Sequence, residues 1–214
     1  MADLYLGRIV AVARNREGRC AALYRVSSRS FPNRRAQRTD RGVAIVPKEG
    51  HEGDVFKNPY IAYNCCRIVG ETAVLTNGAQ TDFIAERIEA GLPVREALAL
   101  TMLAMDYEHD KLDTPRVAAV VRRGAEAGYL AVVRKDGLEV RRVELDPGAC
   151  VWVATYEHDS VDPGRRDAFA ATSPEAACDY VLGEGAFAQF RNPITAVCAL
   201  AADTGFALAA RDAK

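Results

Sequence analysis

Two apolar runs separated by a turn open the chain and predict a β-hairpin. Leu4 to Arg14 is rich in Ile, Val, Leu and Tyr, and the pattern resumes from Cys20 to Val26. The intervening Asn15-Arg16-Glu17-Gly18 supplies the polar and glycine residues of a turn. A second hairpin is predicted for Tyr60 to Val69 and Thr72 to Thr76, joined by Gly70-Glu71, and a short strand for Val43 to Val46, ended by Pro47.

The segment Ser27 to Gly42, between these strands, has almost no hydrophobic residue besides Phe31. It contains Pro32 and Asn33 together with arginines at positions 29, 34, 35, 38 and 41. We interpret it as a long loop or an edge segment of a sheet.

Helical spacing replaces the strand pattern after residue 80. Ile84, Ile88 and Leu92 recur on one face, and Thr81-Asp82 begins that helix. Pro93 opens a second helix that is apolar on more than one side, so we expect this helix to be buried between layers.

The second half contains further strands and one capped helix. Ser173 and Pro174 place an N-cap and a first-turn proline before a helix over Ala176 to Leu182. Lys135-Asp136-Gly137 is a strong hairpin turn. Strands are predicted at Val117 to Val121, Tyr129 to Arg134, Leu138 to Leu145, Cys150 to Tyr156 and Phe206 to Ala210, and Thr195 to Ala202 is interpreted as helical.

Strands joined by hairpins, with helices grouped in sequence, indicate antiparallel sheets and not a doubly wound parallel sheet. No repeat, low-complexity tract or linker divides the chain. We therefore predict one α+β domain over residues 1–214, in which two packed sheets are covered by helices. The phosphate-binding loops GxGxxG and GxxxxGK[ST] do not occur.

The composition is that of a globular protein, with 49% hydrophobic and 27% charged residues. A formal net charge of -1 gives no reason to expect DNA or an anionic membrane as partner. No signal peptide or membrane span is recognisable, so we expect a cytoplasmic protein. The cysteines lack metal-binding spacing and are expected to be reduced, buried thiols: Cys20, Cys65, Cys66, Cys150, Cys178 and Cys198.

Two polar segments in the first third of the chain are candidates for substrate binding. From Arg25 to Arg34, arginine forks with Ser28 could cradle a phosphate, and a solvated loop or a surface for single-stranded RNA is the alternative. From Asn58 to Asn64, the side chains of Asn58, Tyr60 and Asn64 share one face if the strand is regular. They could orient a substrate, or the tyrosines could simply belong to the core.

Two further polar segments, later in the chain, are candidates for the functional site. Asn77 lies in the turn Thr76 to Asp82, which turn and capping chemistry explain fully. Asp106 to Asp110 is unexpected, because anions are unfavourable at a helix C-terminus. A carboxylate leaving apolar surroundings can have a raised pKa and act as a general acid or base, whereas a solvated loop is the alternative. The histidines lie on separate loops and predict no metal site.

In their fixed order these segments resemble the archaeal-type IMP cyclohydrolase family. The matching strings are Tyr5 to Arg8, Tyr24 to Arg34, Asn58 to Asn64, Thr76 to Gly78 and Ala104 to Glu108, with looser similarity to the end. The resemblance implies a four-layer αββα sandwich like that of the N-terminal-nucleophile hydrolases. It also implies ring closure of 5-formamidoimidazole-4-carboxamide ribonucleotide to IMP with loss of water, by an enzyme of the cyclic-amidine hydrolase class, without metal or organic cofactor. A homo-oligomer is expected, with no subunit number fixed by the sequence.

Cyclisation within one substrate needs a near-attack geometry, proton transfer and stabilisation of an oxyanion. We assign Arg25 or Arg29, with Ser28, to the 5′-phosphate or the oxyanion. Tyr60 and Asn64 would orient the carboxamide and formyl groups. Asp106 or Glu108 would transfer protons, with Tyr107 as a further donor, and the predicted substrate-binding set is completed by Asn33, Asn58 and Asn77. An amidohydrolase of the same fold would need an N-terminal Ser, Thr or Cys, which Met1-Ala2-Asp3 does not offer.

Overall fold

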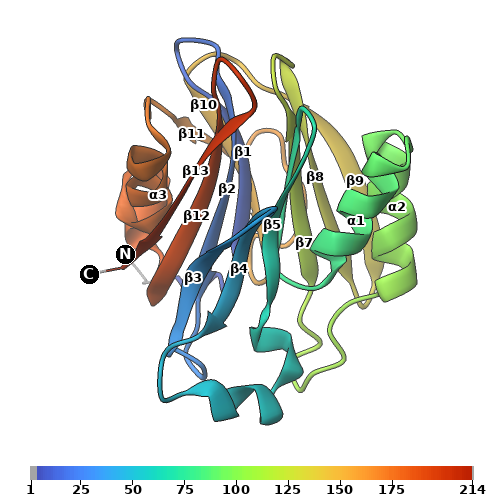
Figure 1. Cartoon of the computed structure of the whole chain (residues 1–214), viewed down its shortest axis with the longest axis vertical. Coiled ribbons are helices and arrows are strands. Elements are labelled where there is room, and N and C mark those ends of the chain that lie inside the picture. The colour runs from blue at the N-terminus through green and yellow to red at the C-terminus, as the bar shows by residue number, and fades with distance from the viewer. Residues whose placement is uncertain (1–3, 214) are drawn as a thin grey trace.

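Two antiparallel sheets pack face to face, and helices cover their outer faces (Figure 1). The computed structural model describes residues 4–213. The strand order is β11-β10-β1-β2-β12-β13 in the six-stranded sheet and β3-β4-β5-β6-β7-β8-β9 in the seven-stranded sheet. Helix α3 covers the first sheet and helices α1 and α2 cover the second, so four layers result.

The six-stranded sheet is built from both ends of the chain. Its strands are β1 Ile9–Arg14, β2 Cys20–Ser27, β10 Ala149–Ala154, β11 Arg166–Ala168, β12 Pro193–Ala201 and β13 Phe206–Asp212. The seven-stranded sheet follows the chain in order, as β3 Arg34–Thr39, β4 Gly42–Pro47, β5 Tyr63–Val69, β6 Thr72–Thr76, β7 Arg116–Arg122, β8 Ala127–Arg134 and β9 Gly137–Glu144. The helices are α1 Gln80–Glu89, α2 Val94–Met105 and α3 Pro174–Gly183, with 3-10 turns η1 Glu52–Phe56, η2 Pro59–Ile61 and η3 Gly185–Gln189.

Strand alternation decides which side chains enter the space between the sheets. On β1, Val10 packs in the inter-sheet core, whereas Ile9 packs on the opposite face toward α3. On β2, Tyr24 points inward and pairs in register with Val10, so its neighbour Arg25 points outward. The same alternation directs Tyr63 of β5 inward and Asn64 outward.

The hairpins and most strands agree with the sequence predictions. The expected edge segment contains β3, which forms one edge of the seven-stranded sheet. Ser173 caps α3 as predicted, because its Oγ accepts a hydrogen bond from the Ala176 N–H at 3.1 Å. All six cysteines are free and buried, which confirms the prediction of reduced thiols.

Three structural predictions are wrong. Thr195 to Ala202 is not a helix and lies almost wholly in strand β12, which is paired on both sides and covered on both faces. Such a strand shows an unbroken apolar run without alternation. Helix α2 is not buried between layers; it lies on the outside, where Leu100 is 50% and Leu103 68% exposed. Tyr60 is not on a strand, because residues 59–61 form η2 and β5 begins at Tyr63.

Two further expectations concern the N-terminus and the membrane. The residues Met1-Ala2-Asp3, on which the argument about an N-terminal nucleophile depends, lie outside the described residues. Over the part of the chain that is described, no helix is long and apolar enough to cross a bilayer.

Candidate functional site

Glu108 is a buried carboxylate held between two arginines. Its residue is 1% exposed, and its Oε2 accepts a hydrogen bond from Arg8 Nη2 at 3.0 Å. On the other side, Arg116 Nη1 lies 3.9 Å from Oε1. Among the described residues Oε1 has no hydrogen-bond partner, although it is buried. A buried acceptor without a donor is rare in folded proteins and marks a position where a ligand can donate.

Burial raises the pKa of the Glu108 carboxyl, and the charges of Arg8 and Arg116 oppose this effect only in part. A carboxyl with a raised pKa can take up and release a proton closer to neutral pH than an ordinary glutamate. Burial thus shifts the pKa of Glu108 in the direction expected for a carboxylate that follows the apolar helix.

A strained turn brings Glu108 to this position. Asp106 ends α2 with φ 55° and ψ -174°, a conformation that side chains other than that of glycine rarely adopt. Its carbonyl oxygen accepts from Arg116 Nε at 2.8 Å. The Glu108 N–H donates to the Thr114 carbonyl at 2.8 Å, which closes the loop. These two hydrogen bonds hold the arginine and the loop that carries the carboxylate.

Glycine lets two backbone segments approach the cluster closely. A Cβ at Gly7 would lie 2.3 Å from Thr155 Oγ1, and one at Gly78 would lie 2.7 Å from Arg116 Nη1. Neither contact is possible for a larger residue without movement. These glycines therefore help to place Arg8 and Arg116.

Buried phenols lie beside the charged cluster. The hydroxyls of Tyr24 and Tyr63 are 2.5 Å apart, and burial raises the pKa of both. A second chain of hydrogen bonds runs from Tyr156 through Thr114 to Asp110, with both oxygen separations 2.8 Å. Because Thr114 donates to the Asp110 carboxylate, Tyr156 donates to Thr114.

The mouth of the site is a cavity of about 610 Å³. The turn η2, which contributes to its lining, lies at the lower end of the sandwich in Figure 1. Three segments that are distant in sequence meet there: the loop after β2, the η1–η2 region and the loop after α2. The Arg116 guanidinium faces the Tyr60 ring at 5.6 Å from its centroid. The lining side chains are Ser30, Phe31, Lys57, Asn58, Pro59, Tyr60, His109, Asp110, Lys111 and Leu112.

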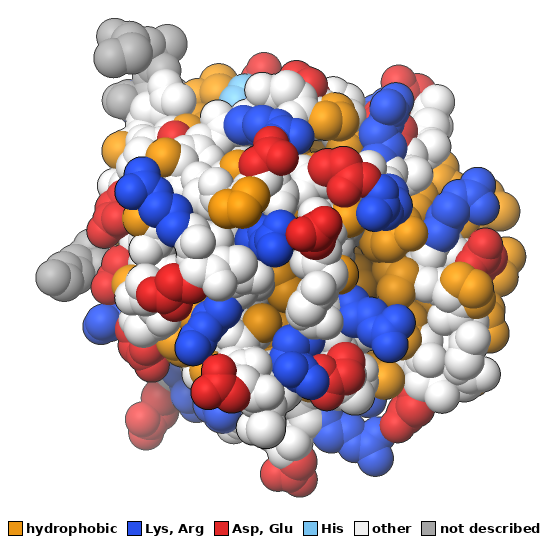
Figure 2. Space-filling view, turned by 90° about the horizontal axis from the view of Figure 1, so that it is seen from above, with side chains coloured by type: hydrophobic (Ala, Val, Ile, Leu, Met, Phe, Trp, Pro, Cys, Tyr) orange, Lys and Arg blue, Asp and Glu red, His pale blue; other side chains and the backbone are white. Residues whose placement is uncertain are grey.

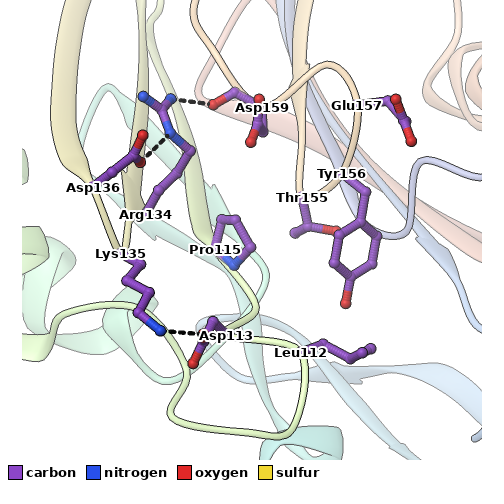
Figure 3. Close-up of a pocket in the computed structure, with 10 residues that line it drawn as sticks. All are labelled: Leu112, Asp113, Pro115, Arg134, Lys135, Asp136, Thr155, Tyr156, Glu157 and Asp159. Atoms are coloured by element: carbon purple, nitrogen blue, oxygen red, sulfur yellow. Dashed lines mark hydrogen bonds and ion pairs between the residues drawn. The ribbon is translucent and has the colours of Figure 1, made fainter.

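A second hollow of about 530 Å³ shares Leu112 with the first. Its cations are already paired: Arg134 with Asp136, and Lys135 with Asp113 at 2.8 Å (Figure 3). In the 610 Å³ cavity Lys57 is also paired, with Asp54 at 2.7 Å, but Lys111 has no ion-pair partner among the described residues. The 610 Å³ cavity is therefore the better candidate for nucleotide binding.

Comparison with known proteins shows the family of the chain. The family model described as IMP cyclohydrolase-like protein matches residues 5–205. The protein named IMP cyclohydrolase from Methanosphaera stadtmanae is 42% identical over 200 residues, which is 94% of this chain and 96% of the relative. The chain belongs to the IMP cyclohydrolase-like family. Two further relatives carry the same name: one from Methanocella arvoryzae, 54% identical over 72% of this chain and 75% of its own, and one from Methanocaldococcus jannaschii, 38% identical over 97% and 99%.

Within this family framework, most of the predicted site residues do come together. Asn58 and Tyr60 line the cavity. Asp106 and Tyr107 lie beside it through their contacts with His109. Glu108 lies near Arg116, whose guanidinium faces the Tyr60 ring. Asn58 Oδ1 accepts from the Tyr60 N–H at 2.8 Å and so caps the turn that presents Tyr60.

The loop after β2 contributes three further predicted residues. Ser28 Oγ accepts from the Phe31 N–H at 3.0 Å. The Arg29 guanidinium lies 4.1 Å from the centroid of the Tyr5 ring, a cation–π contact. Asn33 Nδ2 lies 3.2 Å from a ring nitrogen of His51 at the rim. The exposed Arg29 is thus held in place from one side with its other side toward solvent.

The assignment of Arg25 to substrate binding is wrong, because Arg25 is fully buried on the other face of β2. Its guanidinium donates to Ser27 Oγ and to the carbonyls of Val181, Leu182, Phe187, Phe190 and Arg191. Burial lowers its pKa to about 10. Arg25 therefore joins β2 to the end of α3 and to η3, and has no contact with the site.

Asn64 and Asn77 also lie away from the site. Asn64 Nδ2 donates to both Asp82 oxygens, at 3.1 and 3.0 Å, on the face covered by α1. Asn77 is fully buried; its Nδ2 donates to the Pro115 carbonyl and its Oδ1 accepts from the Val117 N–H. Asn77 also accepts from Gln80, whose Oε1 accepts from Arg116 at 3.0 Å, so it supports Arg116 indirectly.

The sequence interpretation did not assign several residues that form the inner part of the site. These are Arg8, Tyr24, Tyr63, Arg116 and Tyr156. Alternation along β2 separates Tyr24 from Arg25, and this signal could have identified the inward side chain. Over residues 4–213, no group of three or more His, Cys, Asp or Glu side chains is arranged to hold a metal ion.

Proposed function

We propose that this protein is an IMP cyclohydrolase that closes the ring of 5-formamidoimidazole-4-carboxamide ribonucleotide and releases water. The carboxamide nitrogen forms a bond to the formyl carbon, and the π electrons of the formyl C=O move onto its oxygen. That oxygen then leaves as water with two protons, one from each reacting nitrogen. The observation that carries the proposal is the unpartnered Oε1 of buried Glu108, beside a cavity of nucleotide size.

Glu108 serves as the proton acceptor in this proposal. Its free Oε1 accepts a proton from nitrogen, and its raised pKa lets it pass that proton to the departing oxygen. Arg8 and Arg116 hold the carboxylate in one orientation, because each approaches a different carboxyl oxygen. Asp106 and Tyr107, on the same loop, remain candidates for contacts with the substrate.

Arg29 is the residue that we assign to the 5′-phosphate. Its guanidinium is fixed on Tyr5, and this reduces the conformational entropy lost on binding. Ser28, Asn33, Asn58 and Tyr60 complete the substrate-binding set in this proposal. Arg29 lines a neighbouring hollow, which shares Leu112 with the 610 Å³ cavity, and Lys111 adds positive charge to that cavity.

The test is the ultraviolet change on adding the formamido nucleotide to the purified protein, with the product identified by chromatography. Stoichiometric IMP and a rate that depends on enzyme concentration are the expected result. Absence of IMP under conditions where the protein is folded would overturn the proposal.

We further propose that the four layers have the architecture of the N-terminal-nucleophile hydrolases and form one domain. In support, residues from β1, β7 and β12 share one inter-sheet core. We also place the protein in the cytoplasm, in keeping with its free cysteines. The end opposite η1 and η2 has basic and acidic side chains interspersed, without the single-sign field typical of nucleic-acid binding (Figure 2).

The expected homo-oligomer stays a proposal. Helix α2 carries the exposed Leu100 and Leu103, and the neighbouring α1 carries Phe83, which is 46% exposed. Exposed apolar side chains on neighbouring helices are typical of a protein–protein interface. We propose that this face contacts a second copy of the chain.

A further inference from the structure

The hydroxyl pair of Tyr24 and Tyr63 leaves one hydrogen without an acceptor. Two hydroxyls 2.5 Å apart share one hydrogen between them, so the second hydrogen must point elsewhere. Among residues 4–213 neither hydroxyl has another hydrogen-bond partner. One phenol of the pair is therefore a free donor.

Burial identifies Tyr63 as that donor. Tyr24 is 0% exposed and packed in the inter-sheet core, whereas Tyr63 is only partly buried. Of the two residues, only Tyr63 keeps some solvent-accessible surface. Tyr24 thus donates to the Tyr63 oxygen, and the Tyr63 hydrogen is left for the ligand.

Two guanidinium groups favour negative charge next to this donor. The positive charges of Arg34 and Arg8 lower the pKa of the Tyr63 hydroxyl, whereas burial raises it. Arg34 is 3% exposed and donates Nε to the Phe31 carbonyl at 3.1 Å. Within the described residues no carboxylate lies within ion-pair distance of Arg34, so its charge is buried without a direct counter-ion. A buried cation of this kind is stabilised when an anion or oxyanion binds nearby.

Arg8 connects this donor to the acceptor described above. Its guanidinium is bonded to Glu108 and also acts electrostatically on Tyr63 and Tyr24. The inner part of the site therefore has one hydroxyl donor and one carboxylate acceptor around a single arginine. Cyclisation needs a donor at the formyl oxygen and an acceptor at the attacking nitrogen.

We propose that Tyr63 is a catalytic residue that donates its hydroxyl hydrogen bond to the formyl oxygen as that oxygen becomes negative, with Tyr24 as its positioning residue. This inference rests on the proposed cyclohydrolase function. When the new C–N bond forms, the π electrons of the C=O bond move onto the formyl oxygen. Tyr63 stabilises the negative charge that develops there. It does not change its own proton count, because the two protons of the leaving water come from the two nitrogens.

The test is Tyr63→Phe, which keeps the ring and removes the donor. We expect kcat to fall by about 100- to 1000-fold, the usual effect of losing one oxyanion donor. Affinity for IMP should change by less than about threefold, since IMP no longer contains the oxygen that Tyr63 contacts. A merely structural role would weaken IMP binding and lower kcat together.

Tyr24→Phe provides a second variant and Tyr129→Phe a matched control. Tyr24→Phe leaves the Tyr63 hydroxyl in place but unsupported, so kcat should fall about tenfold with IMP affinity kept. Tyr129 packs against the helix-covered face of the seven-stranded sheet, and its phenylalanine variant should keep kcat. If Tyr63→Phe does not fold, the Tyr24→Phe result decides the proposal.

The outcomes separate this inference from the proposed function. A wild-type protein that forms no IMP overturns the function. A wild-type protein that forms IMP, with kcat retained in Tyr63→Phe or, where that variant does not fold, in Tyr24→Phe, overturns only the role of the phenol pair. Loss of IMP affinity in proportion to kcat also overturns it.

Discussion

Arg8 Nη2 lies 3.0 Å from Glu108 Oε2, although the two residues are 100 positions apart in the chain. The contact joins the start of β1, in the six-stranded sheet, to the loop that enters β7 of the seven-stranded sheet. The ion pair therefore spans both sheets at the end where the cavity opens. The arrangement leaves Oε1 of Glu108 without a hydrogen-bond partner among the described residues, so this oxygen can accept a proton from the substrate.

Replacing Glu108 by Gln should lower kcat by about 100-fold or more, because a general base contributes a factor of that order. The amide oxygen can still accept from Arg8, so the loop geometry and KM should change little. The matched control is Asp113→Asn, since Asp113 lies on the same loop and pairs with exposed Lys135. Unchanged kcat in Glu108→Gln would remove Glu108 from the proposed mechanism.

The rate should depend on pH through the same carboxyl. Because burial raises the pKa of Glu108, the acidic limb of kcat/KM should lie above the ordinary glutamate range. The rate rises with pH as Glu108 ionises, whereas the contribution of Glu108 to the unfolding free energy falls with pH. The reason is that a carboxyl whose pKa is higher in the folded state binds its proton more tightly there. Its contribution is fully present below the unfolded pKa and is lost as pH rises through the folded pKa.

Rate profiles and unfolding curves of the wild type and Glu108→Gln, recorded from about pH 4 to pH 8, test this dependence. Glu108→Gln should lack the acidic limb of kcat/KM that Glu108 causes. It should also lack the contribution of Glu108 to the pH dependence of the unfolding free energy. A wild-type limb within the ordinary glutamate range would contradict the prediction.

Arg29→Ala should raise KM about 10- to 100-fold with little change in kcat, because a charge-assisted hydrogen bond to phosphate is lost. Initial rates over a range of nucleotide concentrations measure this. Arg35→Ala is the control, since Arg35 lies on edge strand β3 and, within residues 4–213, its side chain hydrogen-bonds only to Gln37. Equal KM values in both variants would show that Arg29 does not bind the phosphate.

The sequence predicted local structure far better than it predicted which residues meet. Hairpin strands were predictable because alternation and turn residues are local signals. Strand β12 was not, because a strand covered on both faces has no alternation. The raised pKa of Glu108 could be anticipated from the apolar helix before it, but its arginine partners could not. Arg8 and Arg116 reach it through long-range strand pairing, which spacing along the chain does not encode.

The oligomer proposal predicts that a charge on the outer face of α2 weakens association. Leu103→Glu should shift the sedimentation coefficient toward the monomer, because Leu103 is 68% exposed and a glutamate there would be desolvated in an interface. Arg95→Glu, at another exposed position of α2, should have a smaller effect. An identical sedimentation profile for the wild type and Leu103→Glu would argue against an interface on this face.

Arg25 is predicted to matter for stability and not for substrate binding. Arg25→Met keeps much of the buried volume but leaves the carbonyls at the end of α3 and in η3 without donors. Each buried unpaired carbonyl costs about 1–3 kcal/mol, so the unfolding free energy should fall by about 3 kcal/mol or more. Denaturant unfolding measures this loss. Below the unfolding transition KM should equal that of the wild type, whereas a large rise in KM at full folding would return Arg25 to the substrate site.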